Sequence, residues 1–165
     1  MNKTVSIEFK PSAEPGPVFE RYADTVYRLA FVRTKSRYDA DDILQEVFLR
    51  YMKVWQSMQS EEHIKAMLIR ITVNCSNSLL TSYWFKKTDS LNDSLYAKSE
   101  DPESNVLSEV LKLPVKYRTV IHLHYYMGYS VEEIAEIISA KPATVKTRLL
   151  RGREKLKNAL GTEDL

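Results

Sequence analysis

The sequence is poor in the residues that build disulfides, metal sites and membrane spans. Its single cysteine, Cys75, excludes an internal disulfide and a cysteine-based metal site. Only four glycines are present and alternating apolar and polar runs are few, which favours an all-helical chain. No stretch of 18 apolar residues occurs, and the first 20 residues lack the apolar segment of a secretory signal. These features predict a cytoplasmic protein.

Charge is nearly balanced over the whole chain but is sorted along it. The 24 basic and 22 acidic residues leave a net charge of +2. Between Lys141 and Lys157, however, seven basic residues face one glutamate, a local charge of +6. The preceding segment, Ser130 to Ile138, holds three glutamates and no basic residue. A strongly basic helix of this kind is a candidate for contact with nucleic acid.

Two C-terminal helical patterns are arranged as a helix-turn-helix. Ser130 followed by Glu133 is a capping box and predicts a helix to Ile138. The three residues 139–141 have the length of the turn in this motif. Pro142 then suits the first position of the next helix, because its missing N–H needs no partner there.

The last helix has one narrow apolar face, which we expect to be buried. That face holds Val145, Leu149, Gly152, Leu156 and Leu160. The candidates for reading base edges in the major groove are Lys146, Thr147, Leu150 and Arg151. The candidates for phosphate contacts are Thr144, Arg148, Arg153 and Lys155. The alternative is a solvated basic surface helix, and the capped partner helix, the turn and the proline argue against it.

An earlier helix is predicted to begin with Asp39 as its N-cap and to continue through DADDILQEVFLRYMKVW. One side of it is broadly apolar. On the other side Leu49 is surrounded by Asp42, Gln45 and Glu46. A lone exposed leucine is common and needs no explanation. An apolar centre within a polar rim also suits a protein-binding face, so both interpretations stand.

Two further helices are expected in this half, from Val18 to Thr34 and from His63 to Trp84. The stretch from Lys65 to Lys87 has four basic residues and no acidic one, and it ends near the aromatic run Tyr83-Trp84-Phe85. Basic groups beside aromatic rings suit single-stranded DNA, whose phosphates meet charge while its bases stack. The competing interpretation is that the aromatic residues belong to the core.

The predicted fold is all-α, with two small helical domains at residues 18–87 and 105–160. Residues 88–104 are rich in Ser, Asp and Asn and read as a flexible acidic linker. Residues 1–17 contain Pro11, Pro15 and Pro17 and read as a tail in which Val5 to Phe9 could form a short strand. Residues 161–165 read as a second tail.

The whole arrangement resembles the extracytoplasmic-function (ECF) subfamily of bacterial sigma-70 factors. The stretch DADDILQEVFL resembles sigma region 2.2, and AMLIRITVN resembles regions 2.3 and 2.4. The residues that resemble sigma region 4 are Leu113-Pro114, Arg118, Val120, Leu123, Tyr126, Gly128, Ser130, Glu133-Ile134-Ala135, the run Thr144 to Leu149, Arg151, Arg153 and Leu156.

This resemblance implies a subunit of RNA polymerase that recognises and melts the promoter −10 element with region 2 and reads the −35 element with region 4. It implies that the β′ coiled coil of core polymerase contacts Asp42, Gln45, Glu46 and Leu49, and that region 4 lies near the β flap. It implies −10 contacts at Asn74, Arg70, Ile64 and Lys65, and a pocket for a flipped base lined by the loop from Gln56 to Ile64. The implied partners are core RNA polymerase, promoter DNA and an anti-sigma factor.

Three positions depart from the family pattern, where Trp is usual at Met67, Asp is frequent at Ser78, and an Arg pair is usual near Ser82. We predict no cofactor, metal ion or small-molecule substrate, because no phosphate loop, metal cluster or nucleophile–base pair is visible. His122 and His124, two residues apart on a helix, face different ways and do not form a metal pair. An enzyme is therefore not expected. The main alternative function is a stand-alone helix-turn-helix transcriptional regulator.

Overall fold

The computed structural model describes residues 12–86 and 102–161, and within these ranges every element is a helix. The elements are α1 (Pro15–Thr34), α2 (Arg37–Val54), the 3-10 turn η1 (Trp55–Ser57), α3 (Glu61–Lys86), α4 (Pro102–Lys112), α5 (Val115–Ile121), the π-helical turn η2 (His122–Tyr126), α6 (Val131–Ile138) and α7 (Pro142–Leu160). The predicted all-α fold is confirmed. None of the helices in the described ranges combines the length and the apolar character that crossing a membrane requires.

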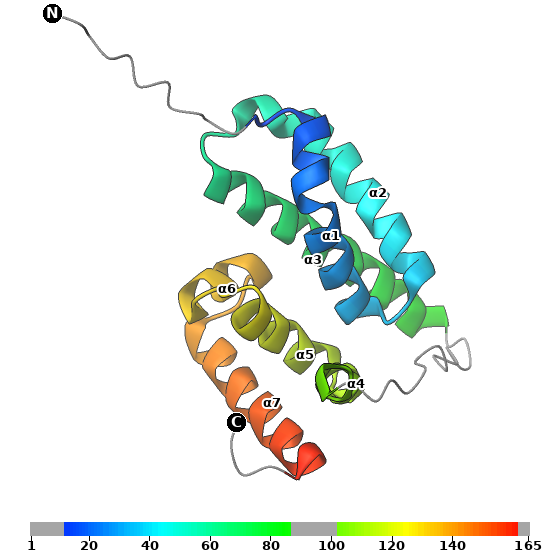
Figure 1. Ribbon diagram of the computed structural model, residues 1–165, viewed down its shortest axis with the longest axis vertical. Coiled ribbons are helices and arrows are strands. Elements are labelled where there is room, and N and C mark those ends of the chain that lie inside the picture. The colour runs from blue at the N-terminus through cyan, green and yellow to red at the C-terminus, as the bar shows by residue number, and fades with distance from the viewer. Residues whose placement is uncertain (1–11, 87–101, 162–165) are drawn as a thin grey trace, which may run out of the picture.

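The helices form two groups that lie against each other (Figure 1). Helices α1, α2 and α3 pack on one another around a core cluster that includes Val26, Val47, Tyr51 and Leu68. Helices α4 to α7 pack around a second cluster that includes Leu123, Ile134 and Val145. Leu29 of α1 and Ile69 and Val73 of α3 belong to this second cluster. The two groups therefore share buried apolar surface.

The starts of the three helices in the first group differ from the predictions. Helix α1 begins at Pro15, inside the predicted tail, because prolines in the first turn forgo only N–H groups that lack helical partners. Helix α2 begins at Arg37, since the Ser36 hydroxyl, not Asp39, is the cap and accepts from the Asp39 amide at 3.2 Å. Helix α3 begins at Glu61, where Ser60 accepts from the amide of His63 at 3.1 Å.

Helix α4 begins at Pro102, within the segment predicted as the end of the linker. The rest of that segment, residues 88–101, and the possible strand from Val5 to Phe9 lie outside the described residues.

The predicted helix-turn-helix is present with its capping box. The Ser130 hydroxyl accepts from the Glu133 amide at 3.1 Å, and the Glu133 carboxylate accepts from the Ser130 amide at 2.7 Å. Pro142 opens α7, as expected. Gly152 faces α5, and a side chain there would meet Ile121 at 3.1 Å, so the glycine allows α5 and α7 to approach closely.

Two buried arginines connect the helix groups. Arg118 of α5 donates to the carbonyl oxygens of Val32 and Arg33, both at 2.5 Å, in the last turn of α1. It also donates to Leu113 O at 2.8 Å. In return, Arg33 donates to the hydroxyl of Thr119 at 2.7 Å. The unpaired carbonyls at a helix C-terminus carry partial negative charge, so a guanidinium is a favourable partner for them.

Candidate nucleic-acid and polymerase interfaces

Helix α7 exposes the face predicted to read base edges. Its buried residues are Val145, Leu149, Gly152 and Leu156, and Leu160 is partly buried. The four candidate base-reading side chains all lie at the surface: Lys146, Thr147, Leu150 and Arg151. Leu150 is 51% exposed, a large apolar group on an otherwise basic helix face. Such a group suits apolar contact with a thymine methyl.

The four candidate phosphate contacts flank that face but differ in their solvent exposure. Lys155 is exposed, whereas Thr144, Arg148 and Arg153 are partly buried. The Arg153 guanidinium donates to the Tyr125 hydroxyl at 2.9 Å, which holds it against η2. These positions place basic groups on both sides of the exposed face, as phosphate contact along a groove requires.

A shallow hollow of about 320 Å³ lies beside this face, between α5 and the first turns of α7. Lys116 and Tyr117 of α5 line it together with Thr144, Arg148 and Arg151 of α7 and two neighbours. The hydrogen bond from Arg151 lowers the pKa of the Tyr117 phenol. The sequence alone does not single out Lys116 and Tyr117, because their place beside α7 depends on how α5 packs.

Helix α2 exposes the face predicted to bind polymerase. Asp42, Gln45, Glu46 and Leu49 are all exposed and lie at i, i+3, i+4 and i+7, on one side of the helix. Leu49 is 56% exposed. The Glu46 carboxylate accepts from Arg50 at 2.8 Å, an exposed ion pair within the helix. The result is an apolar side chain within a rim of acidic and amide groups.

The four residues predicted to contact the −10 element lie on α3 in different environments. Asn74 and Arg70 are exposed, and Lys65 is partly buried. Ile64 is only 2% exposed and packs in the core cluster of the first helix group. The packing of α3 against α1 and α2 thus separates Ile64 from the three polar candidates.

The N-terminal half of α3 faces α6 across a cavity of about 460 Å³. The Arg70 guanidinium approaches the carbonyl oxygen of Glu136 at 3.5 Å, and the Lys65 ammonium lies 5.4 Å from the centre of the Tyr129 ring. Met67, the position where the family usually has Trp, also lines this cavity. In this arrangement the second helix group covers part of the surface predicted to meet single-stranded DNA.

Two titratable groups lie buried near the boundary between the helix groups. Burial, and then repulsion from Arg118, lowers the pKa of Arg33 to about 10. Burial, and then repulsion from Arg28, lowers the pKa of His122 to about 4. His122 Nε2 has no hydrogen-bond partner among the described residues. His124 differs, since its Nδ1 lies 2.8 Å from the carbonyl oxygen of Tyr129.

In residues 12–86 and 102–161, no group of three or more His, Cys, Asp or Glu side chains could hold a metal ion. Cys75 is buried, and burial raises the pKa of its thiol.

The two helix groups both match models of a known protein family. Residues 18–85 match the family model for sigma-70 region 2, and residues 104–156 match that for sigma-70 region 4. The ECF RNA polymerase sigma factor SigW of Bacillus subtilis (strain 168) is 33% identical, over 87% of this chain and 87% of SigW. The chain belongs to the ECF sigma-70 factors. The RNA polymerase sigma factor SigV of the same organism is also 33% identical, over 84% of this chain and 86% of SigV.

Two solved structures share the fold. The sigma factor RpoE of Bartonella quintana, in complex with the anti-sigma factor NepR, matches with a TM-score of 0.72 at 19% identity and covers 88% of this chain and 95% of RpoE. CnrH, in complex with the cytosolic domain of CnrY, matches with a TM-score of 0.64 at 24% identity, over 91% of this chain and 89% of CnrH.

This sigma factor therefore directs promoter-specific transcription initiation by RNA polymerase. The alternative of a stand-alone regulator is excluded, because the first helix group is sigma region 2 and not an unrelated sensor domain.

Proposed function

We propose that the exposed face of α2 is the main contact with core RNA polymerase. Leu49 would insert as the apolar centre, with Asp42, Gln45 and Glu46 forming the polar rim, an arrangement typical of protein interfaces. The partner surfaces expected from the family are the β′ coiled coil for this face and the β flap for the second helix group. The observation that carries the proposal is the 56% exposure of Leu49 among acidic and amide groups.

We further propose that α7 reads the −35 element in the major groove. Lys146, Thr147, Leu150 and Arg151 would meet base edges, because they are exposed together on one face. Thr144, Arg148, Arg153 and Lys155 would contact phosphates and fix the register of the helix. Lys116, beside the first turns of α7, adds a further cation on the same side.

For the −10 element, we propose that Lys65, Arg70 and Asn74 contact the opened strand. Ile64 supports this surface from beneath, since its side chain lies in the core. Because Lys65 and Arg70 contact Tyr129 and Glu136, strand binding at α3 requires α6 to move away. Region 2 and region 4 would then act as separate units, at about residues 18–87 and 105–160, on two distant promoter elements.

An anti-sigma factor is the third proposed partner, supported by the solved sigma factor of this fold that is bound to the anti-sigma factor NepR. We propose a cytoplasmic location, where bacterial RNA polymerase meets chromosomal DNA. We also propose that the chain acts by binding alone and leaves nucleotide chemistry to the polymerase.

The proposed division of labour is tested by a gel-shift experiment followed by in vitro transcription. Promoters would first be recovered by transcribing a genomic pool with this chain and core polymerase. The chain alone, core polymerase alone and the holoenzyme would then be titrated against a recovered promoter. The expected result is sequence-specific retardation by the holoenzyme only. Equal retardation by the chain without polymerase would contradict the proposal.

A further inference from the structure

The connection between α2 and α3 is tied to α1 by three side chains, which we call the Arg21 clamp: Arg21, Tyr22 and Glu61. Arg21 donates to both carboxylate oxygens of Glu61, from Nε at 3.1 Å and from Nη2 at 3.2 Å. The Tyr22 hydroxyl donates to the same carboxylate at 2.5 Å. Glu61 is the first residue of α3, so the clamp joins helices whose contacting residues are about 40 positions apart.

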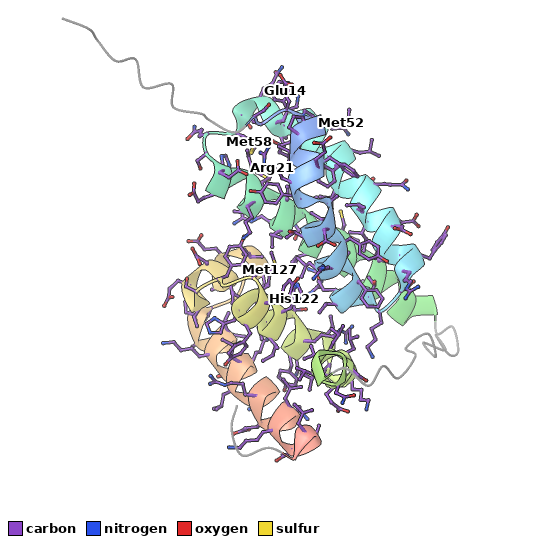
Figure 2. The ribbon with its side chains drawn as sticks, viewed as in Figure 1. Glu14, Arg21, Met52, Met58, His122 and Met127 are labelled. Atoms are coloured by element: carbon purple, nitrogen blue, oxygen red, sulfur yellow. The ribbon has the colours of Figure 1, made fainter. Side chains whose placement is uncertain are left out.

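The clamp is also anchored on its other side. Arg21 Nη2 donates to the carbonyl oxygen of Ser12 at 2.9 Å, and the hydroxyl of the buried Tyr51 donates to Ala13 O at 2.6 Å. Burial, and then the hydrogen bond to Glu61, raises the pKa of Tyr22 to about 12, so this phenol stays a donor at neutral pH. In the view of Figure 2, the labels of Arg21, Met58 and Glu14 all fall at the end of the first helix group where α1 begins.

The connection held by the clamp is short, ordered and polar at its surface. Trp55 and Met58 pack against the core cluster of the first helix group. The Ser57 hydroxyl donates to Val54 O at 2.7 Å, and Ser60 caps α3. The side chains that remain at the surface include those of Gln56, Ser57, Gln59 and Ser60. Amide and hydroxyl groups both donate and accept, which is what hydrogen bonding to the edge of an unpaired base requires.

We propose that Arg21, Tyr22 and Glu61 are positioning residues for recognition of an unpaired promoter base. They fix the start of α3, and with it the connection, residues 55–60, against α1, so that the amide and hydroxyl side chains of the connection meet the base in one geometry. This inference rests on the proposed −10 role of α3. Discrimination between bases depends on the place of the polar groups, because a misplaced donor leaves both partners unpaired. The clamp residues need not touch the DNA.

The test measures base discrimination by the holoenzyme. The probes are a single-stranded oligonucleotide from the non-template strand of a recovered promoter, spanning its −10 element, and a scrambled oligonucleotide of the same composition. The discrimination ratio is the affinity for the first divided by the affinity for the second. Tyr22→Phe removes only the hydroxyl, and Arg21→Lys keeps the charge but loses the two-pronged geometry. The matched control is Asp24→Asn, which removes an exposed ion pair of the same helix, Asp24 to Arg28 at 2.8 Å.

For Tyr22→Phe and Arg21→Lys we expect the discrimination ratio to fall about tenfold. A small displacement of a binding group can cause a loss of this size. Binding of the scrambled oligonucleotide should be unchanged, and Asp24→Asn should match the original chain. An unchanged ratio in both clamp variants would overturn the inference. So would an equal loss of affinity for both oligonucleotides, which would indicate a structural role only. If the unaltered holoenzyme itself failed to discriminate, the proposed −10 role would fall first, and this inference with it.

Discussion

Replacing Arg118 with alanine tests whether the guanidinium at the boundary of the two helix groups stabilises the fold. Arg118 is 7% exposed and donates to three carbonyl oxygens: those of Val32 and Arg33 at the end of α1, and that of Leu113 just after α4. The substitution removes all three hydrogen bonds. It leaves buried carbonyl groups without this partner and opens a space where the side chain had been.

The magnitude follows from opposing contributions. A hydrogen bond from a charged donor contributes roughly 1.5–3 kcal/mol, so three contribute about 4.5–9 kcal/mol. Removing the guanidinium also removes the cost of burying its charge, which is several kcal/mol. Water entering the space partly replaces the lost bonds. We therefore expect Arg118→Ala to lower the free energy of unfolding by about 3–5 kcal/mol.

The assay is urea unfolding followed by circular dichroism, at neutral pH and in the absence of DNA. The matched control is Arg50→Ala, which removes an arginine whose exposed pair with Glu46 should contribute less than about 1 kcal/mol. A change for Arg118→Ala no larger than that of the control would refute the reasoning. It would mean that these hydrogen bonds do not contribute to the stability of the folded chain.

Three further predictions concern the interfaces and the buried histidine. Leu49→Asp should abolish co-elution with core polymerase in gel filtration, without loss of helix content, because it places a charge at the apolar centre of the α2 face. Arg151→Ala should weaken holoenzyme binding to duplex −35 DNA about 10- to 100-fold, whereas Lys155→Ala should mainly reduce the salt dependence measured in the same titration. The pKa of His122 is 6.5 in the unfolded chain and about 4 in the folded chain, so only the unfolded chain binds this proton between these two pH values. The free energy of unfolding should therefore fall by about 3 kcal/mol as the pH is lowered from 6.5 to 4. His122→Phe should remove that part of the acid destabilisation in thermal melts.

The helix-turn-helix could be predicted because its signals are local. The capping box joins Ser130 and Glu133, only three residues apart, and Pro142 acts within its own turn. The buried face of α7 follows from helical periodicity, and the structure confirms it at Val145 and Leu149. The exposed face of α2 around Leu49 likewise follows from helical periodicity.

Local sequence signals did not predict a helix start correctly where two nearby residues were both suitable N-caps. Ser36 and Asp39 are both good N-caps, and the backbone before α2 selects the serine. Pro15 and Pro17 read as helix breakers, yet both fit the first turn of α1, where their missing amides need no partner. The resemblance to the family assigned Ile64 to −10 contact. It did not indicate that the side chain is buried, because burial depends on the packing of α3.

The sequence by itself determined the helical class, the order of the two sigma regions and the faces of α2 and α7, because each depends on residues within a few turns of one another. Only the tertiary structure placed Arg118 against the end of α1, Tyr117 beside Arg151 and Arg21 on Glu61. These contacts join residues 34 to 86 positions apart. No periodicity or capping pattern encodes such pairs, since they arise only when packed helices bring their surfaces together.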